Sequence, residues 1–441
     1  MTVAPSPPLE FVIVGGSIGG LTAAYTLRRA GHKVLVLEKR EAGTVTHGGV
    51  RIPPNMTRLL ETLPGATELL GKYGTQCSGL TFVDGETSQE LGKMKFIDEV
   101  MADLGCQFYM LPYDILLEYL LDLCQNSGVE IRYHVQVTSI RLCSQAKPSV
   151  VTVSGECIEA DVLVGADGHH SLVRDALLLE QEVVEEEECD FDEGGSHSSS
   201  FTLPSNLTEI VGSTCSIVVS QLQDDPEMME LVVNSDEAQI CLSAATEFVT
   251  ILHSKRPSVH VVQCGPDLYI ISIVRTDGIK DGEMETVWIL NPLVVNANGA
   301  QILRDQEPRV NRLIALAPTC LRTIQRIPKV EDGFALGRVF SHLTSRDHIA
   351  FLLNGYHEVR HKRTTATEAS ELSGIVASTF PPGPARDARN RQFKTMSLID
   401  GETEMADEVI AATWATYLVQ FNYDAIEAVD EWWLNWGKLV R

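Results

Sequence analysis

Residues 11–38 read FVIVGGSIGGLTAAYTLRRAGHKVLVLE, and this stretch decides the fold. Its two short apolar runs, 11–14 and 34–37, are typical of buried parallel strands. The residues between them have helical spacing, and Gly31 is placed to end that helix. A strand, a glycine-rich turn, a helix and a second strand within roughly 30 residues predict a dinucleotide-binding βαβ unit. An ordinary βαβ turn is the alternative.

Each part of such a unit has a distinct physical task. Gly15 permits the tight turn after the first strand, and Gly20 lets the helix pack close against the sheet. The helix start presents free N–H groups and a positive dipole end to a pyrophosphate. Glu38 can accept hydrogen bonds from the adenosine ribose, and its charge disfavours the 2′-phosphate of NADP. Ser17 replaces the middle glycine of the pattern, and it is small enough for close approach to phosphate and can donate a hydrogen bond.

Composition narrows the classes of function. The chain has 441 residues and a net charge of -25, so it repels nucleic acid and anionic membranes. Much of the acidity lies in residues 180–193, a run typical of a solvated loop. No apolar stretch approaches the roughly 20 residues of a membrane span. The ten cysteines include no CxxC pair, which indicates neither a zinc site nor a disulfide framework, and the N-terminus has no secretory signal, so we expect a cytoplasmic protein without metal.

A second motif lies about 150 residues downstream. The buried strand predicted for 160–164 runs into GADGHHSLVR at 165–174. Taken alone, Asp167 could cap a helix and Arg174 could pair with it. Taken with the glycine loop, the motif resembles the second fingerprint of the group A flavoprotein monooxygenases, the family of para-hydroxybenzoate and salicylate hydroxylases. The resemblance implies bound FAD, with the aspartate region serving FAD and a transient NAD(P)H.

Other segments carry the same resemblance. Residues 47–60 resemble a family loop that lines the flavin ring, although a rigid Pro-Pro turn before a helix is an equal alternative. Residues 307–326 resemble a helix of the second domain that leads back to the flavin, and residues 389–433 resemble the fungal branch. The candidate cofactor-binding residues are Gly15, Gly16, Ser17, Gly20, Glu38, Arg40, Gly49, Arg51, Asp167 and Gly168.

The expected fold class is α/β, a Rossmann-like FAD-binding domain with an inserted mixed-sheet substrate domain and C-terminal helices. We expect the FAD-binding domain over 9–180, the substrate domain over 181–325, and the rest of the FAD-binding domain with the C-terminal helices over 326–441. Short β-rich runs between 201 and 293 predict the mixed sheet. No catalytic residue is assigned there, because each polar or aromatic candidate is better explained as a packed or surface residue than as part of a substrate pocket: His253, His260, Tyr269, Arg275 and Trp288.

Two departures from the family pattern are visible. Bacterial members carry an HRxDL segment that supplies an arginine, whereas residues 110–115 read MLPYDI. The third fingerprint, a VLLLGDAAH-type strand, is absent, since Lys329 is followed directly by Val330 and the Glu331-Asp332 pair that should follow the strand. We expect a gap in the sheet with unpaired ladder groups, and fewer donors for the flavin ring. Either a gene prediction omits an exon, or the chain is a variant with altered or lost activity.

The resemblance implies an FAD-dependent monooxygenase, as in aromatic catabolism or fungal secondary metabolism. With NAD(P)H and O₂ it would hydroxylate an aromatic or phenolic small molecule through a flavin C4a-hydroperoxide. Hydroxylation at a carboxylated carbon would release CO₂. The alternative is a dinucleotide-binding relative with reduced or no oxygenase activity, while residues 165–174 argue against an NAD-linked dehydrogenase. The chain is expected to be a monomer or homodimer, with its three C-terminal tryptophans, Trp432, Trp433 and Trp436, packing within the chain or at an interface.

Overall fold

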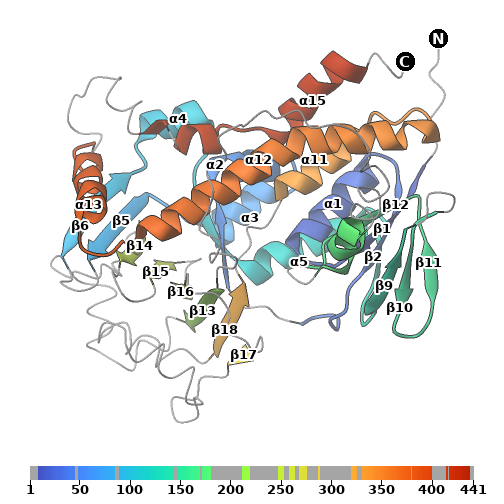
Figure 1. The fold of residues 1–441 in the computed structure, drawn as a ribbon, viewed down its shortest axis with the longest axis horizontal. Coiled ribbons are helices and arrows are strands. Elements are labelled where there is room, and N and C mark those ends of the chain that lie inside the picture. The colour runs from blue at the N-terminus through green and yellow to red at the C-terminus, as the bar shows by residue number, and fades with distance from the viewer. Residues whose placement is uncertain are drawn as a thin grey trace, which may run out of the picture.

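The computed structural model describes most of the chain on either side of a sparsely described middle (Figure 1). Between 180 and 329 it describes only six strands, and no side chains. The described ranges outside this middle are 8–44, 48–84, 89–142, 147–168, 171–179, 330–378, 380–399, 414–415 and 417–437.

The predicted βαβ unit forms the centre of a four-stranded parallel sheet with the order β12-β1-β2-β8. Helix α1 (Ile18–Arg29) connects β1 to β2, as predicted. Alternate residues of β1 face opposite layers, since Phe11 and Ile13 pack on the helical side and Val12 and Val14 on the other. The strands of this sheet are β1 (Glu10–Val14), β2 (Lys33–Leu37), β8 (Glu130–Arg132) and β12 (Val162–Gly165).

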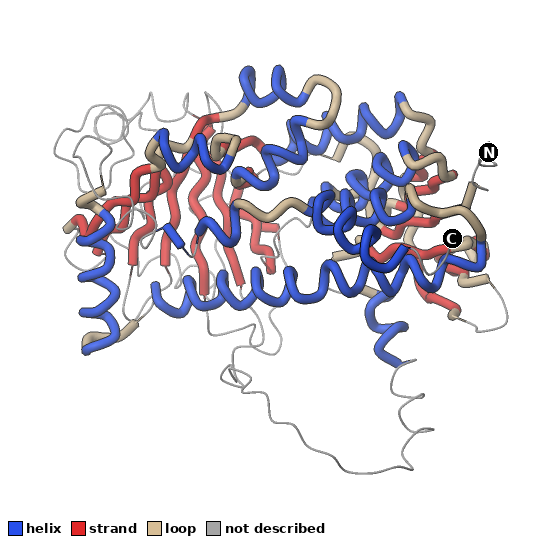
Figure 2. Tube along the Cα trace, turned by 90° about the horizontal axis from the view of Figure 1, so that it is seen from above, coloured by secondary structure: helices blue, strands red, loops and turns tan. Residues whose placement is uncertain are grey.

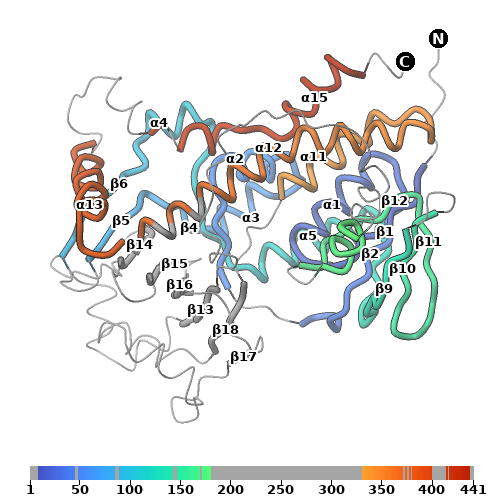
Figure 3. The backbone as a smooth tube through the Cα atoms, in the orientation of Figure 1, coloured from blue at the N-terminus to red at the C-terminus, as the bar shows by residue number. Residues whose placement is uncertain are grey.

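A small antiparallel sheet covers one face of the parallel sheet, and helices cover the other. Val137 and Val150 of the small sheet share a core with Val12. On the opposite face, α5 (Tyr113–Asn126) and α11 (Val330–Phe340) pack against α1. Figure 3 shows α1 and α11 side by side although their sequences lie far apart. The small sheet consists of β9 (Val137–Arg141), β10 (Ser149–Thr152) and β11 (Cys157–Glu159).

The backbones of α11 and α1 approach each other closely because two glycines of α11 face α1. A Cβ on Gly333 would lie 2.8 Å from the backbone nitrogen of Ala23, and a Cβ on Gly337 would lie 2.4 Å from the Cβ of Thr26. The Oγ1 of Thr26 also donates to the carbonyl of Gly333 at 2.7 Å. Any larger residue at either glycine would push the two helices apart.

The gap that we expected inside the parallel sheet is not found. Strand β12 pairs with β1 on one side, and no described residue pairs with its other side. Among the described residues β12 is therefore the outer strand of this sheet, because it comes last in the order of the four paired strands.

The second sheet has eight strands in the order β17-β18-β13-β16-β15-β14-β5-β6, and only β5 and β14 pair in parallel. It contains the mixed sheet expected within 181–325, but it also takes two strands from 79–95. Residues 319–324, expected to be helical, form a strand whose residues pair with β13. The eight strands are β5 (Gly79–Asp84), β6 (Glu90–Lys95), β13 (Val211–Val218), β14 (Glu247–Leu252), β15 (Ser258–Gln263), β16 (Leu268–Arg275), β17 (Val287–Trp288) and β18 (Thr319–Ile324).

The C-terminal helices connect the two sheets. Helix α12 (Ile349–Ser378) runs alongside both groups of strands (Figure 2). Helix α13 (Pro384–Met396) covers the edge of the eight-stranded sheet, where Phe393 stacks on Phe82 with ring centroids 3.9 Å apart. Helix α15 (Ala425–Trp436) returns to the parallel-sheet end, where Trp432 donates to Glu358. None of the helices described here is long and apolar enough to span a membrane.

Short elements complete the fold. Trp433 stacks on His342 with centroids 4.3 Å apart, whereas Trp436 remains 52% exposed, so two of the three tryptophans pack within the chain. The remaining elements are β3 (Gly49–Ile52), β4 (Thr75–Gln76), β7 (Tyr109–Pro112), α2 (Pro54–Glu61), α3 (Ala66–Tyr73), α4 (Asp98–Leu104) and the 3₁₀ turn η1 (Arg346–His348).

Candidate cofactor site

The glycine loop between β1 and α1 allows three backbone segments to meet. Gly15 has φ +107°, which favours glycine, and a Cβ there would lie 2.1 Å from the carbonyl oxygen of Ala166. A Cβ on Gly20 would lie 2.0 Å from the carbonyl oxygen of Gly15. Ala166 donates its N–H to Val14 at 2.8 Å. The two sequence motifs are therefore in direct contact at the carboxyl ends of β1 and β12.

Open space lies beside the first turn of α1. A Cβ added to Gly19 would meet no atom within 4 Å, unlike the other glycines of the loop. The first N–H groups of a helix have no intrahelical acceptor, and Ser17, the N-cap residue of α1, makes no side-chain capping hydrogen bond. These N–H groups and the positive helix end form a site that fits an anionic diphosphate.

Glu38, at the end of β2, is 5% exposed and is held by hydrogen bonds. Its Oε2 accepts from the N–H of Gly16 at 2.7 Å, and its Oε1 accepts from the N–H of Arg40 at 2.9 Å and from the Arg40 Nε at 3.0 Å. Burial raises the pKa of Glu38, but the hydrogen bonds from Arg40 and Gly16 and the charge of Arg40 outweigh it and hold the pKa below its ordinary value. The carboxylate is therefore charged at neutral pH.

The side chain of Arg40 covers the carboxylate of Glu38. Its Nη2 lies 3.3 Å from Oε2, so four donors share the two carboxylate oxygens, which have about four lone-pair positions. A ribose hydroxyl that binds to Glu38 must therefore replace a side-chain donor of Arg40.

The aspartate of the second motif caps a helix, which is the alternative that the sequence left open. Asp167 accepts from the Ser171 hydroxyl at 2.5 Å and from the Val173 N–H at 3.4 Å, at the start of helix 172–179. Arg174 lies 3.6 Å from Asp175. Gly168 has φ +87° and open space at its Cβ position, so the backbone after Asp167 is accessible next to the glycine loop.

The segment expected to line the flavin ring forms β3, which pairs with β7. Gly49 and Arg51 lie on the exposed side of β3, while Val50 and Ile52 are buried. Pro54 opens α2 directly after the strand, so the Pro-Pro turn before a helix is also present. The start of this segment reaches α5, because the N–H of Tyr113 donates to the Gly48 carbonyl at 2.9 Å.

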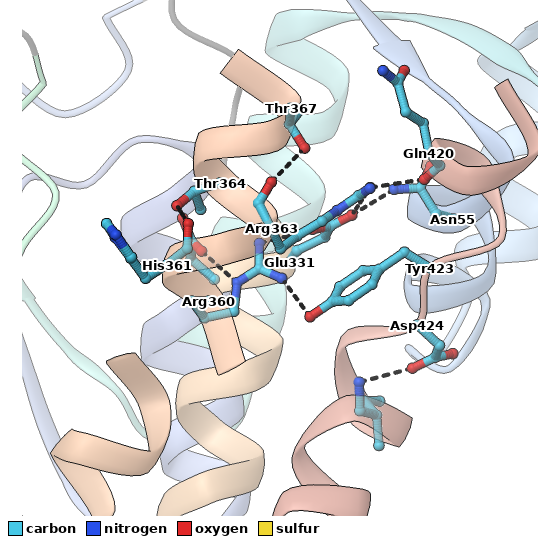
Figure 4. A network of polar contacts seen from close by, with 12 residues as sticks. Asn55, Glu331, Arg360, His361, Arg363, Thr364, Thr367, Gln420, Tyr423 and Asp424 are labelled. Atoms are coloured by element: carbon cyan, nitrogen blue, oxygen red, sulfur yellow. Dashed lines mark hydrogen bonds and ion pairs between the residues drawn. The ribbon is translucent and has the colours of Figure 1, made fainter. Parts of the chain in front are cut away.

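A buried ion network holds the first turn of α11 (Figure 4). Glu331 accepts from Arg360 Nη2 at 2.7 Å and from Arg363 Nη2 at 3.0 Å, and Asp332 accepts from Arg360 Nε at 2.8 Å. Burial raises the pKa of Glu331, but the hydrogen bond from Arg363 and the charges of both arginines keep it below its ordinary value. The side chain of Arg360 is 6% exposed. The Glu331-Asp332 pair recognised in the sequence therefore forms buried ion pairs with the arginines of α12.

The network also reaches the loop before α2 and the C-terminal segment. Asn55 Nδ2 donates to Glu331 Oε1 at 2.6 Å, and Tyr423 accepts a hydrogen bond from Arg360 Nη1 at 3.0 Å. Asn55 is 6% exposed, and its Oδ1 has no hydrogen-bond partner among the residues described. The sequence did not reveal Arg360 or Arg363, because only the packing of α12 on α11 brings them to Glu331.

The structure leaves the substrate-domain candidates open. His253 lies outside the described residues, and the side chains of the other four, on β15, β16 and β17, are not described: His260, Tyr269, Arg275 and Trp288. Within the part of the chain that is described, no group of three or more His, Cys, Asp or Glu residues could hold a metal ion.

Comparisons with known proteins agree with this geometry. A family model described as "FAD binding domain" matches residues 9–241, more than half of the chain. The FAD-dependent monooxygenase OpS4 of Beauveria bassiana (strain ARSEF 2860) is 23% identical over 444 residues, which cover 96% of this chain and 97% of that protein. The 3-hydroxybenzoate 6-hydroxylase 1 of Aquipseudomonas alcaligenes is 30% identical over 175 residues, 38% of this chain and 43% of the relative.

Solved structures share the fold at low identity. The structure of CtdE in complex with FAD and a substrate has a TM-score of 0.64 at 15% identity and covers 98% of this chain and 99% of that one. The structure of Klebsiella pneumoniae HpxO with FAD and uric acid has a TM-score of 0.63 at 16% identity and covers 93% of this chain and 97% of that one.

Proposed function

The chain belongs to the FAD binding domain family of aromatic FAD-dependent monooxygenases, and we propose that it hydroxylates an aromatic or phenolic small molecule with NAD(P)H and O₂. The observation that carries the proposal is that the glycine loop, Glu38 and the Asp167 turn lie together at the carboxyl ends of the parallel strands. Ligands of open α/β sheets bind in this position. The hydroxybenzoate hydroxylase among the relatives supports an aromatic substrate.

The described residues fit the ADP half of FAD. The first turn of α1 and the open space beside Gly19 would receive the diphosphate, and Glu38 would receive the ribose after Arg40 turns aside. Gly168 and the exposed side of β3, with Gly49 and Arg51, are proposed to face the remaining parts of the cofactor. Bound FAD supplies the redox chemistry, taking two electrons from NAD(P)H and delivering one oxygen atom of O₂ to the substrate while the other leaves as water.

A second candidate function is dinucleotide binding with reduced or no oxygenase activity. It is favoured by the absence of the third fingerprint from the sequence around Lys329 and Val330, and by β12, which has no partner on its outer side among the described residues. A chain of this kind would bind FAD chiefly through the ADP half and would hold the flavin ring with fewer backbone donors.

The visible spectrum of the purified protein tests the cofactor. A yellow protein with flavin absorption in roughly equimolar amount supports FAD binding, and a colourless protein that takes up no added FAD refutes it. NADH and NADPH oxidation is then measured with a panel of phenols and aromatic acids. Stimulation by a substrate, together with a hydroxylated product, supports the monooxygenase, while a flavin-loaded protein without either supports the second candidate.

A further inference from the structure

The departure from the glycine pattern at Ser17 and the departure from the HRxDL segment at residues 110–115 meet in the structure. Ser17 stands where the glycine loop usually has its middle glycine, and Tyr113 lies in the segment that lacks an arginine. The Ser17 Oγ and the Tyr113 hydroxyl lie 3.1 Å apart, although the residues are 96 positions apart in sequence. Tyr113 is the first residue of α5, and its backbone N–H holds the Gly48 carbonyl, so its side chain is placed from two sides.

One hydroxyl proton of this pair is not used in the hydrogen bond between the two side chains. Each hydroxyl carries one proton, and the hydrogen bond between them uses one of the two. Neither hydroxyl has another hydrogen-bond partner among the residues that the structure describes. Both residues are half-buried, so the second proton can be donated to an acceptor in the open space beside α1.

We propose that Tyr113 is a further FAD-binding residue, which donates together with Ser17 to the diphosphate of the cofactor. Ser17 immediately precedes the first-turn N–H groups of α1 that face the space beside Gly19. A phosphate oxygen bound to these N–H groups lies next to the side chain of the N-cap residue. The hydroxyl pair therefore contacts the diphosphate, and neither the adenine nor the flavin ring. The inference rests on the proposed binding of FAD.

The test compares ligands that share different parts of FAD. The apoprotein is titrated with FAD, ADP and adenosine, for wild type, Tyr113→Phe and Tyr119→Phe. Tyr119 is the matched control, because it lies on the same helix and its hydroxyl donates to the Pro64 carbonyl at 3.0 Å. Loss of a hydrogen bond to a charged group is expected to raise the Kd for FAD and ADP by the same factor, roughly tenfold or more, in Tyr113→Phe only. Adenosine binding should be unchanged.

If Tyr113→Phe binds FAD and ADP with the same Kd values as wild type, the proposal is overturned and FAD binding itself is left intact. A wild-type protein that binds neither FAD nor ADP overturns the proposed cofactor as well. A Tyr113→Phe loss confined to FAD also contradicts the proposal, because it places Tyr113 at the flavin half. Thermal unfolding of the apoproteins checks that each variant is folded.

A second variant, Ser17→Gly, keeps the proposal testable if Tyr113→Phe does not fold. Glycine restores the usual pattern, so tighter FAD binding by Ser17→Gly would show that Ser17 is only a poor substitute, and would overturn the proposal. We expect weaker binding of FAD and ADP instead. In the double variant the two losses should be less than multiplicative, since both changes break the same hydroxyl pair.

Discussion

Replacing Glu331 by glutamine should destabilise the protein far more than an ordinary loss of charge. The Glu331 carboxylate accepts from both arginines of α12 and from Asn55, with donor–acceptor distances between 2.6 and 3.2 Å. With Asp332 it balances the two guanidinium groups of Arg360 and Arg363. The Glu331→Gln variant keeps the shape, removes one negative charge and turns an amide NH₂ toward guanidinium donors.

The magnitude follows from burial. The side chains of Glu331, Arg360 and Arg363 are 14%, 6% and 11% exposed, so water cannot replace the lost carboxylate. Removing one partner of a buried ion pair costs about 3–5 kcal/mol of the free energy of unfolding, because an uncompensated charge remains. For a chain of 441 residues we expect Tm to fall by roughly 3–5 °C, because the entropy of unfolding grows with chain length.

Thermal unfolding followed by circular dichroism measures the effect, with Glu130→Gln as the matched control. Glu130 accepts from Arg132 Nε at 2.7 Å, but their side chains are 60% and 40% exposed, so the control should lose at most about 1 kcal/mol. Adding Arg363→Met to Glu331→Gln restores the charge balance and should recover part of the loss. If Glu331→Gln unfolds at the temperature of the control, the network is not desolvated and the reasoning is refuted.

Three further predictions concern the nucleotide site and the adjoining core. Glu38→Gln should weaken FAD binding by roughly tenfold to a hundredfold in a titration of the apoprotein, since a charged acceptor for the ribose is lost; unchanged affinity would show that Glu38 does not hold the ribose. Gly15→Ala should fail to fold or lose Tm because its Cβ would meet Ala166, whereas Gly19→Ala should keep its Tm and lose FAD affinity, since its Cβ enters open space; equal Tm values for the two would contradict this. Burial lowers the pKa of His32 below its ordinary 6.5, although a hydrogen bond with a backbone carbonyl opposes this, so the unfolded chain protonates first and stability should fall as pH drops below about 6.5; Tm measured at pH 7.5 and 5.5 should fall less in His32→Gln.

Local signals predicted the geometry of the βαβ unit well. The glycines and Glu38 act within one βαβ unit, so their spacing alone specifies the turn at Gly15 and the strand that ends before Glu38. The strand at 319–324 was missed because the prediction followed the resemblance of residues 307–326 to a helix of the family's second domain.

Contacts between distant segments could not be predicted in this way. Tyr113 pairs with Ser17, and Arg360 with Glu331, only because particular helices pack together. No sequence motif links the two members of either pair. The position of β12 at the outer side of the sheet also depends on how segments far apart in the sequence pack together. The sequence predicted that a strand-forming segment is missing, but only the strand order shows that the four described strands of the parallel sheet pair without interruption.

The position of α11 does not depend on the missing segment, and this separates the two halves of the proposed site. Its glycine face is fixed by α1, where Thr26 bonds the carbonyl of Gly333, and its first turn is fixed by the arginines that bind Glu331. Both attachments join residues of α11 to α1 or to the later helix α12. Neither involves the residues immediately before α11, so the helix can keep its place without a strand before it. We therefore expect α11 to keep its place even if a segment is missing before it, and expect such a loss to affect the flavin-ring half, whose chemistry the substrate-stimulated oxidation assay reports.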